Sequence, residues 1–235
     1  MKYKNHVFFG TILILLVMMS SFTYLNNSRR LIEKIEVNFE SQGGRFLTDF
    51  VVDKLLIQKN GVLPWKAKDS LVLGMLETFL ENNPYVDNAE VFQFKKGVLG
   101  VTIQEKKPVL RIQGTDQFYL DKEGNYFPVS KNHTPKVPLF LGELKENQKN
   151  DLLLLIKHLS ADTFLHNELA FIQYRSNSYF IGLRSYEFEI EIGQMQGIVE
   201  KLSKLKVFCA YHDNLTLERE YSLINLKFKN QVVGS

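Results

Sequence analysis

The sequence predicts an α+β protein with an N-terminal transmembrane helix, then a β-α-α-β-β domain and a mixed β domain with packed helices. Three observations support this prediction. An uncharged apolar run covers Val7–Leu25, strand and helix periodicities follow one another over Leu31–Ile103, and strand patterns dominate beyond Pro108. We therefore expect a cytoplasmic tail over residues 1–6, a transmembrane anchor over 7–25, and two exported domains over 31–105 and 106–233.

The apolar run is long enough to cross a membrane. As a helix rising about 1.5 Å per residue, Val7–Leu25 spans roughly 28 Å, close to the ~30 Å hydrocarbon core of a bilayer. A cleaved secretory signal is the alternative, but signal cores are usually about 7–15 residues long, and Ser20–Thr23 make a poor cleavage site. Basic residues flank both ends, so charge alone does not set the orientation. The short tail favours a cytoplasmic N-terminus and a periplasmic C-terminal domain.

Composition limits the kinds of partner the protein can bind and the kinds of interaction that stabilise its fold. The net charge is +3 over 235 residues, and the part beyond the tail lysines Lys2 and Lys4 is close to neutral. That part lacks the basic stripe that phosphate neutralisation needs, so we expect no nucleic acid partner. Cys209 is the only cysteine. An exported domain without a disulfide must be held together by packing, which is typical of a bacterial envelope protein.

The first exported domain begins with a strand and a helix. Ile35, Val37 and Phe39 alternate with polar residues, which predicts a strand with one buried face. Apolar residues then recur at helical spacing and predict an amphipathic helix that ends near Gly61 and Pro64. The apolar face of this helix consists of Phe46, Leu47, Phe50, Val51 and Leu55.

A second helix and a hairpin complete this domain. Asp69 or Ser70 can cap the helix at its start. Its apolar stripe consists of Val72, Met75, Leu76 and Phe79. Two short strand patterns, Ala89–Phe94 and Val98–Ile103, follow and are joined by a turn over Lys95–Gly97. A helix pair that covers a three-stranded sheet is large enough to fold alone.

Several motifs occur along the chain in a definite order. Asn83-Pro84-Tyr85-Val86 precedes the hairpin, and the segment 101–108 (VTIQEKKP) ends it. Phe118-Tyr119-Leu120-Asp121, then Gly124, opens the second domain, and Tyr221–Val233 closes it. In these features nearly the whole chain resembles the FtsQ/DivIB cell-division family, with its POTRA domain, its Tyr-x-Asp-x-x-Gly segment and its closing strand. Where that family commonly has Asp-Leu-Arg-Tyr in the closing strand, this chain has Asn225, Leu226, Lys227 and Phe228.

Strand patterns alternate with helices in the second domain. A helical stretch over Asp151–Leu159 precedes the strands Phe171–Tyr174 and Tyr179–Leu183. A further helix is expected over Gln194–Phe208, and the last strand, about Tyr221–Phe228, at or near a sheet edge. The expected apolar stripe of the later helix is Met195, Ile198, Val199, Leu202 and Leu205, with Lys201 and Lys204 facing away.

The sequence predicts no catalytic, metal or cofactor site, and we do not expect an enzyme. The densest carboxylate cluster is Glu187, Glu189 and Glu191, whose alternation with apolar residues predicts the solvated outer face of a strand. Cys209 follows an apolar helical face, so we expect a small buried side chain rather than a nucleophile. The histidines are too scattered for a zinc site: His6, His133, His158, His166 and His212.

A binding role follows from the expected sheet edge. An exposed edge strand offers unpaired N–H and C=O groups that a partner strand can pair with. The resemblance implies that the last strand receives a segment of the FtsB-like subunit of the FtsB–FtsL coiled-coil pair, with Lys227 and Phe228 as side-chain anchors. The candidate partner-binding residues are Tyr221, Ser222, Ile224, Asn225, Leu226, Lys227 and Phe228. The alternative interpretation is that these residues only form the last core strand.

The resemblance thus implies a non-catalytic, single-pass scaffold of the bacterial divisome in the inner membrane, concentrated at the division septum. It also implies that the POTRA-like domain recruits other division proteins through its sheet edge. One alternative is a POTRA-bearing component of envelope transport or outer-membrane assembly, which would need several such units and a barrel. Another is a membrane-anchored periplasmic cell-wall hydrolase, which would need a pocket with strongly perturbed acid groups.

Overall fold

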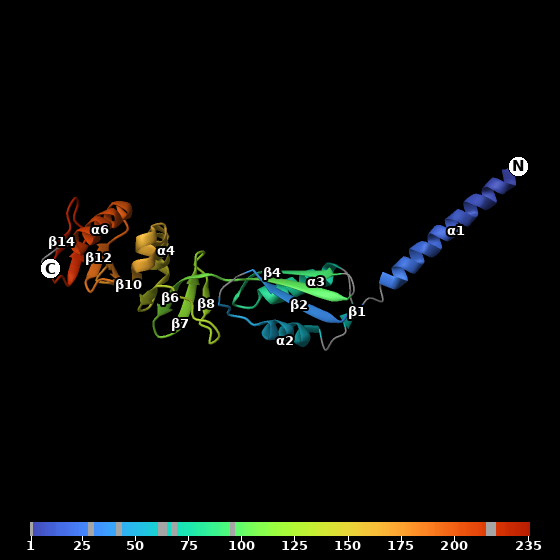
Figure 1. The fold of residues 1–235 in the computed structure, drawn as a ribbon, viewed down its shortest axis with the longest axis horizontal. Helices are drawn as coiled ribbons and strands as arrows, with labels where there is room; N and C mark the ends of the chain where they lie inside the picture. The colour runs from blue at the N-terminus through green and yellow to red at the C-terminus, as the bar shows by residue number, and fades with distance from the viewer. Residues whose placement is uncertain are drawn as a thin grey trace. The chain divides into compact units, whose positions relative to one another are not determined.

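The computed structural model describes residues 2–27, 31–40, 44–60, 65–66, 70–94, 97–214 and 220–235. Helices and mixed sheets make up the fold, so the predicted α+β class is confirmed. The chain divides into two compact units, Met1–Lys106 and Lys107–Ser235, which Figure 1 colours blue to green and green to red. The predicted helix end at Gly61 and Pro64, the cap at Asp69 and the turn residues Lys95 and Lys96 lie outside the described residues.

The apolar N-terminal run lies within helix α1 (Lys2–Asn27), seen in blue in Figure 1. Over the part of the chain that the structure describes, no helix combines the length and the hydropathy that a membrane crossing requires. The expected transmembrane anchor therefore lacks structural support and stays a prediction.

The first unit contains a three-stranded sheet with the order β2-β5-β4 and a separate two-stranded ribbon of β1 and β3. Strand β5 pairs in parallel with β2 and antiparallel with β4. The bounds are β1 Leu31–Ile32, β2 Lys34–Phe39, α2 Asp49–Asn60, β3 Trp65–Lys66, α3 Ser70–Glu81, β4 Val86–Phe94 and β5 Val98–Glu105. The order β2-α2-α3-β4-β5 is the β-α-α-β-β order expected from periodicity, whereas the likeness to a POTRA domain stays a prediction.

Helix α2 starts later than the apolar spacing predicts. Thr48 accepts a hydrogen bond from Val51 N–H on its Oγ1 at 3.3 Å, which is the geometry of an N-cap, so the helix begins at Asp49. This start sets the rotation of the helix, and Val52 and Leu56 are fully buried. Phe50 is 74% exposed, so its predicted place on the apolar face is wrong.

Two motif residues hold the first unit together. The buried carboxylate of Glu105 accepts hydrogen bonds from the backbone N–H groups of Phe46 at 3.1 Å and Leu47 at 2.6 Å. Asn83 accepts from Tyr85 N–H on its side chain at 3.1 Å and from Val86 N–H on its carbonyl at 3.0 Å. Such an Asx turn ends α3 and leads directly into β4. Both motifs therefore have a structural role.

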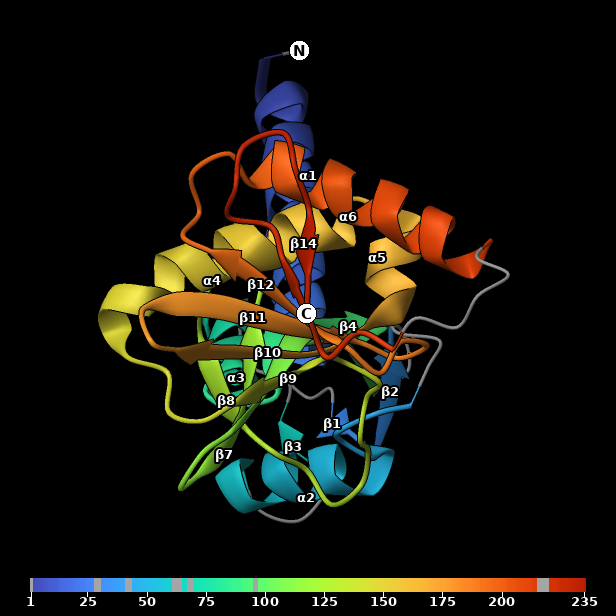
Figure 2. The same ribbon diagram turned by 90° about the vertical axis from the view of Figure 1, so that its left-hand side faces the viewer.

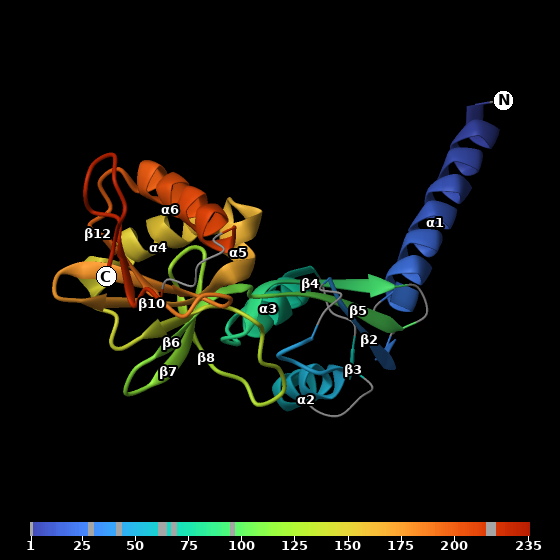
Figure 3. The same ribbon diagram turned by 60° about the vertical axis from the view of Figure 1, so that its left-hand side comes forward.

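The second unit is built on a nine-stranded mixed sheet with the order β14-β13-β12-β11-β10-β9-β6-β7-β8. Its strands are β6 Pro108–Gln113, β7 Gln117–Asp121, β8 Tyr126–Pro128, β9 Leu139–Leu141, β10 Leu169–Arg175, β11 Ser178–Leu183, β12 Glu189–Gly193, β13 Leu223–Asn225 and β14 Val233–Gly234. Its helices are α4 Glu146–Ser160, α5 Thr163–Glu168 and α6 Ile198–Asp213. Figures 2 and 3 show these helices together on one side of strands β10 to β12.

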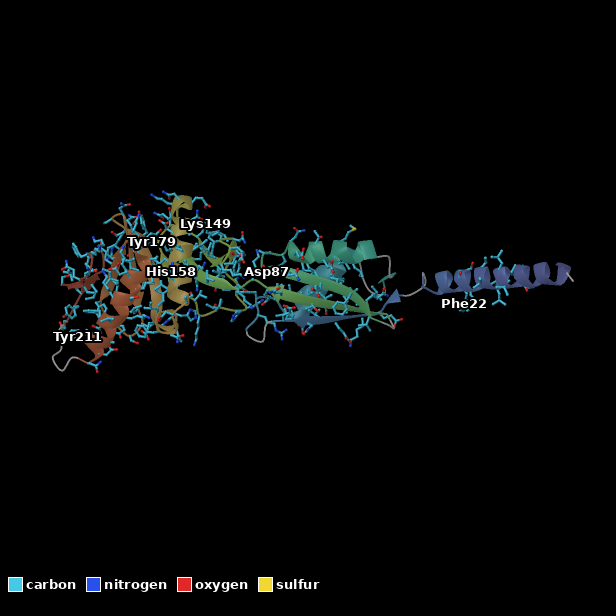
Figure 4. The ribbon with its side chains drawn as sticks, turned by 90° about the horizontal axis from the view of Figure 1, so that it is seen from above. Phe22, Asp87, Lys149, His158, Tyr179 and Tyr211 are labelled. Carbon is cyan, nitrogen blue, oxygen red and sulfur yellow. The ribbon has the colours of Figure 1, made fainter. Side chains whose placement is uncertain are left out.

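One core joins the sheet and the helices of this unit. Leu152, Leu155 and Leu159 of α4 and Leu202 and Leu205 of α6 are buried. Tyr179 of β11, labelled in Figure 4, donates its hydroxyl to the Gln148 carbonyl of α4 at 3.1 Å. Burial raises the pKa of that phenol strongly. The Tyr179 hydroxyl thus fixes α4 against the sheet.

Candidate partner-binding site

The C-terminal residues expected to form an edge strand give a shorter, inner strand. Only Leu223–Asn225 form β13, which runs parallel to β12. On its other side Ile224 lies opposite Gly234 and Asn225 opposite Val233, so β14 covers it. The outermost strand at this end of the sheet is therefore β14, which is labelled with the C-terminus in Figure 2.

Backbone hydrogen bonds attach the C-terminal residues to β13. The N–H groups of Ser222 and Leu223 donate to the Ser235 carbonyl at 2.7 and 3.2 Å. Ser235 N–H donates to the Leu223 carbonyl at 3.0 Å. The Ser222 hydroxyl also donates to the Ser235 carbonyl, at 3.0 Å. Residues predicted to contact a partner thus bind the chain's own end.

Two of the predicted site residues are core residues. The side chains of Ile224 and Leu226 are fully buried in the second unit. Glu189 N–H donates to the Ser222 carbonyl at 3.1 Å and Leu226 N–H to the Glu191 carbonyl at 2.9 Å, which continues the ladder with β12. Any contribution of these two positions to a partner therefore comes from the backbone.

Asn225 and Lys227 bind a buried carboxylate. Asn225 Nδ2 donates to Glu191 Oε2 at 2.7 Å, and Lys227 Nζ donates to Glu191 Oε1 at 2.6 Å. Glu191 is only 8% exposed, so the prediction of a solvated outer face is wrong for this residue. The neighbouring Glu189 pairs with Arg175, whereas Glu187 is exposed. The three glutamates therefore have three different environments.

Lys204 of α6 holds the segment that connects β13 to β14. Its Nζ lies 3.2 Å from the Leu226 carbonyl, 2.6 Å from the Phe228 carbonyl and 3.5 Å from the Gln231 carbonyl. The prediction that Lys204 faces away from the core side of the helix is therefore wrong. Phe228 itself is 46% exposed, and it is the predicted anchor residue that is most open to a partner.

Tyr221 lies between α6 and the C-terminal strand. Its ring contacts Phe208 at 5.5 Å and His212 at 6.1 Å between centroids. A Cβ atom added at Gly234 would lie 2.5 Å from the Tyr221 ring, so the ring covers this glycine directly. The phenol side chain and β14 are therefore packed against each other.

The described residues offer little for catalysis. Burial raises the pKa of the Cys209 thiol to about 11, which makes this side chain a poor nucleophile. Among the residues that the structure describes, no three His, Cys, Asp or Glu side chains gather closely enough to hold a metal ion. His158 lies on α4 and Tyr211 on α6, as Figure 4 shows, and His166 lies on α5.

Two open grooves lie in the second unit. One of about 500 Å³ is lined by Asp116, Phe118, Tyr126 and Glu143 among others. Another of about 780 Å³ lies along α4 and includes Leu153 and Leu154 in its lining. Neither lining places a histidine or a cysteine beside a carboxylate.

Comparison with known families matches the second unit. A family model described as FtsQ/DivIB, C-terminal related, covers residues 107–235, which is more than half of the chain. The chain belongs to the FtsQ/DivIB family. No curated protein matches it. The match begins at the boundary between the two units. Membership in the FtsQ/DivIB family indicates a role in cell division.

In this FtsQ/DivIB protein the Tyr-x-Asp-x-x-Gly segment forms the turn between β7 and β8. Asp121 accepts hydrogen bonds from Asn125 N–H at 2.7 Å and from Asn125 Nδ2 at 3.0 Å. Gly124 has a φ of +85°, a conformation that favours glycine. The sequence motif thus identifies a hairpin rather than a ligand site.

Sequence reasoning missed the residues that organise the C-terminal edge. These are Glu191, Lys204 and the strand β14. Asn230 adopts a φ of +59° between β13 and β14, and Lys229-Asn230 before two valines is a hairpin signal that could have revealed β14. The contacts of Lys204 carry no local signal, because they join residues more than twenty positions apart.

Proposed function

We propose that this FtsQ/DivIB protein is a non-catalytic scaffold of the divisome that binds an FtsB–FtsL type pair at the β13 end of its C-terminal sheet. In this role it helps to assemble septal peptidoglycan synthesis. The observation that supports the site is the short cover of β13, because among the described residues only the two-residue strand β14 pairs with its outer side. A strand edge so thinly covered is suited to pairing with an added strand.

The side chains around this edge support the same proposal. Phe228 and Val233 are 46% and 42% exposed, and Lys227 keeps 42% of its side chain exposed while bound to Glu191. Aromatic and apolar side chains beside an exposed backbone edge give a partner strand both hydrogen bonds and side-chain contacts. We propose Tyr221, Lys227 and Phe228 as the side chains that a partner contacts.

We further propose that the first unit recruits other division proteins through β2. The opposite edge of its sheet, β4, has two donors taken by glutamates of α3: Val91 N–H by Glu77 at 2.9 Å and Ala89 N–H by Glu81 at 3.4 Å. Among the described residues no strand pairs with the outer side of β2. Side-chain caps block a strand edge, so β2 is the better candidate for strand addition.

Membrane attachment is part of the proposal. The run Val7–Leu25 carries no charge, and its described apolar side chains, such as Leu13 and Met18, are 65% and 67% exposed. We propose a single-pass anchor in the inner membrane with the C-terminal domain in the periplasm. Extraction of membranes with alkaline carbonate tests this arrangement, since an anchored chain stays in the membrane fraction and an unanchored chain is released.

Affinity isolation tests the partner proposal. The tagged full-length protein in detergent should capture the FtsB–FtsL type pair, and Phe228→Ala should lower the capture at least about tenfold. Phe118→Ala is the matched control, because Phe118 is 38% exposed near the opposite end of the sheet, and this variant should capture normally. Equal capture by wild type and Phe228→Ala would place the partner site elsewhere. Depletion of the protein should give filamentous cells that do not divide.

A further inference from the structure

We infer that residues 233–235, hereafter the strap, occupy the place that a partner strand takes, so that binding exchanges the strap for an antiparallel strand of the partner. This inference rests on the proposed function, and it adds how the site is closed in the free protein and which strand fits it.

The strap is held mainly by its backbone. Its ladder with β13 has two register pairs, and Ser235 exchanges both backbone hydrogen bonds with Leu223. All three strap residues are exposed, and Val233 keeps 42% of its surface in solvent. Segments with few buried apolar contacts open locally without unfolding the rest of the protein.

The chain is fixed immediately before the strap. Val232 packs against the core of the second unit, and the Gln231 carbonyl lies 3.5 Å from Lys204 Nζ. The same Lys204 Nζ donates to the Phe228 carbonyl at 2.6 Å. The boundary between the fixed and the removable part of the chain therefore falls between Val232 and Val233.

The surface under the strap does not depend on it. Ile224 and Leu226 are fully buried, and Asn225 and Lys227 are bound to Glu191. These contacts come from β12 and from the core, so β13 keeps its position when the strap leaves. A preformed edge lowers the ordering cost of binding an added strand.

The geometry also selects the strand that fits. Ile224 lies opposite Gly234, and the Tyr221 ring covers that glycine so closely that a Cβ atom would approach it within 2.5 Å. We therefore expect the partner strand to carry glycine opposite Ile224. Opposite Asn225, the position held by Val233 is open to solvent and accepts larger apolar side chains.

A disulfide lock tests whether the strap must leave. Leu223 and Ser235 form a hydrogen-bonded antiparallel pair, whose Cα separation of about 5.5 Å suits a disulfide. The full-length double variant Leu223→Cys/Ser235→Cys, when oxidised, should capture the FtsB–FtsL type pair at least about tenfold less than when reduced. Leu223→Cys alone is the matched control and should capture equally in both states. Cys209 is buried and does not compete for the new thiols.

Removal of the strap gives two further readouts, one with the partner pair and one without it. The chain lacking residues 233–235 should capture the pair several-fold better, because no strap competes for the edge. Without a partner it should form dimers or larger species by gel filtration, since an uncovered strand edge pairs with another copy. Val233→Thr, which keeps the strap, is the control and should stay at the size of the wild type.

The outcomes separate this inference from the proposed function. Equal capture by the oxidised and the reduced lock would overturn the strap inference and leave the partner proposal standing. Failure of the wild type and of both reduced variants to capture the pair would overturn the proposed function. In that case gel filtration still decides the strap: self-association on its removal supports the inference, and unchanged size contradicts it.

Discussion

The two ends of the nine-stranded sheet are closed in different ways. At one end β8 contributes Phe127, which is 2% exposed, and finishes with Pro128, which has no N–H to donate. The turn before β8 is fixed by Asp121 and Gly124. At the other end β14 is exposed along its length and is held to β13 by backbone bonds.

The difference teaches which edge of this sheet can exchange strands. An edge strand that contributes a buried aromatic ring and carries a proline cannot leave or extend without loss of core contacts. An edge strand that contributes only a backbone ladder can leave at low cost. The β14 end is therefore adapted to binding and the β8 end to stability.

Alanine substitution at the two edge strands should show the largest contrast. Phe127→Ala should lower the free energy of unfolding by about 3–5 kcal/mol, because it removes a buried ring that packs on Tyr119. Val233→Ala should change the same quantity by less than about 0.5 kcal/mol. Urea unfolding of both variants followed by far-UV circular dichroism measures the two changes. Similar losses in the two variants would contradict the distinction between the ends.

The next effect concerns the carboxylate beneath the β14 end. Glu191→Gln should lower the free energy of unfolding by about 1–3 kcal/mol, because Lys227 loses its charged partner. Glu187→Gln, at an exposed glutamate four residues earlier and just before β12, is the matched control and should cost less than about 0.5 kcal/mol. A double-mutant cycle with Lys227→Met isolates the pair. If Glu191→Gln and its control are equally stable, Glu191 does not organise this edge.

A smaller effect should follow from the lysine that holds the connecting segment. Lys204→Met keeps the aliphatic stem and removes contacts to three carbonyl groups, so we expect a loss of about 1 kcal/mol. Hydrogen exchange should accelerate in residues 226–231. In Lys206→Met, which breaks only the pair with Asp162, exchange of that segment should not change. Unchanged exchange of residues 226–231 in Lys204→Met would contradict the claim that Lys204 holds the segment between β13 and β14.

The smallest expected effect concerns whether local opening is confined to β14 or also involves α6. Cys209 lies on α6 behind this end of the sheet, and burial raises the pKa of its thiol to about 11. At pH 8 the thiolate fraction is then about 0.1%, and a thiol reagent should label the native protein slowly and the urea-unfolded protein quickly. The labelling rate should rise with pH. Rapid labelling of the native protein at pH 8 would mean that α6 also opens locally and exposes the Cys209 thiol.

Much of the fold could be predicted from periodicity, because burial on a strand follows a period of two. Ile190 and Ile192 are buried as their alternation predicts, and the helix expected over Asp151–Leu159 lies within α4. Helix faces were less predictable. Met75 and Val199 are 57% and 62% exposed, since the start of a helix and its neighbours set the rotation that apolar spacing leaves open.

The candidate site was predicted in position but not in detail. The C-terminal strand was expected, whereas β14 was not, because its two residues carry no alternation of their own and only the turn at Lys229-Asn230 before them indicates a hairpin. Burial of Glu191 was also beyond sequence reasoning. Its alternation with apolar residues looks like that of a solvated strand face, and only the distant Asn225 and Lys227 make its buried position favourable.

The most direct test of the account is hydrogen exchange of the full chain with and without the FtsB–FtsL type pair. We predict slower exchange in residues 221–225 on binding, faster exchange in residues 233–235, and no change in β8. Slower exchange confined to β8 or to the helices, with residues 221–235 unchanged, would contradict the claim that the β13 edge is where the partner strand binds.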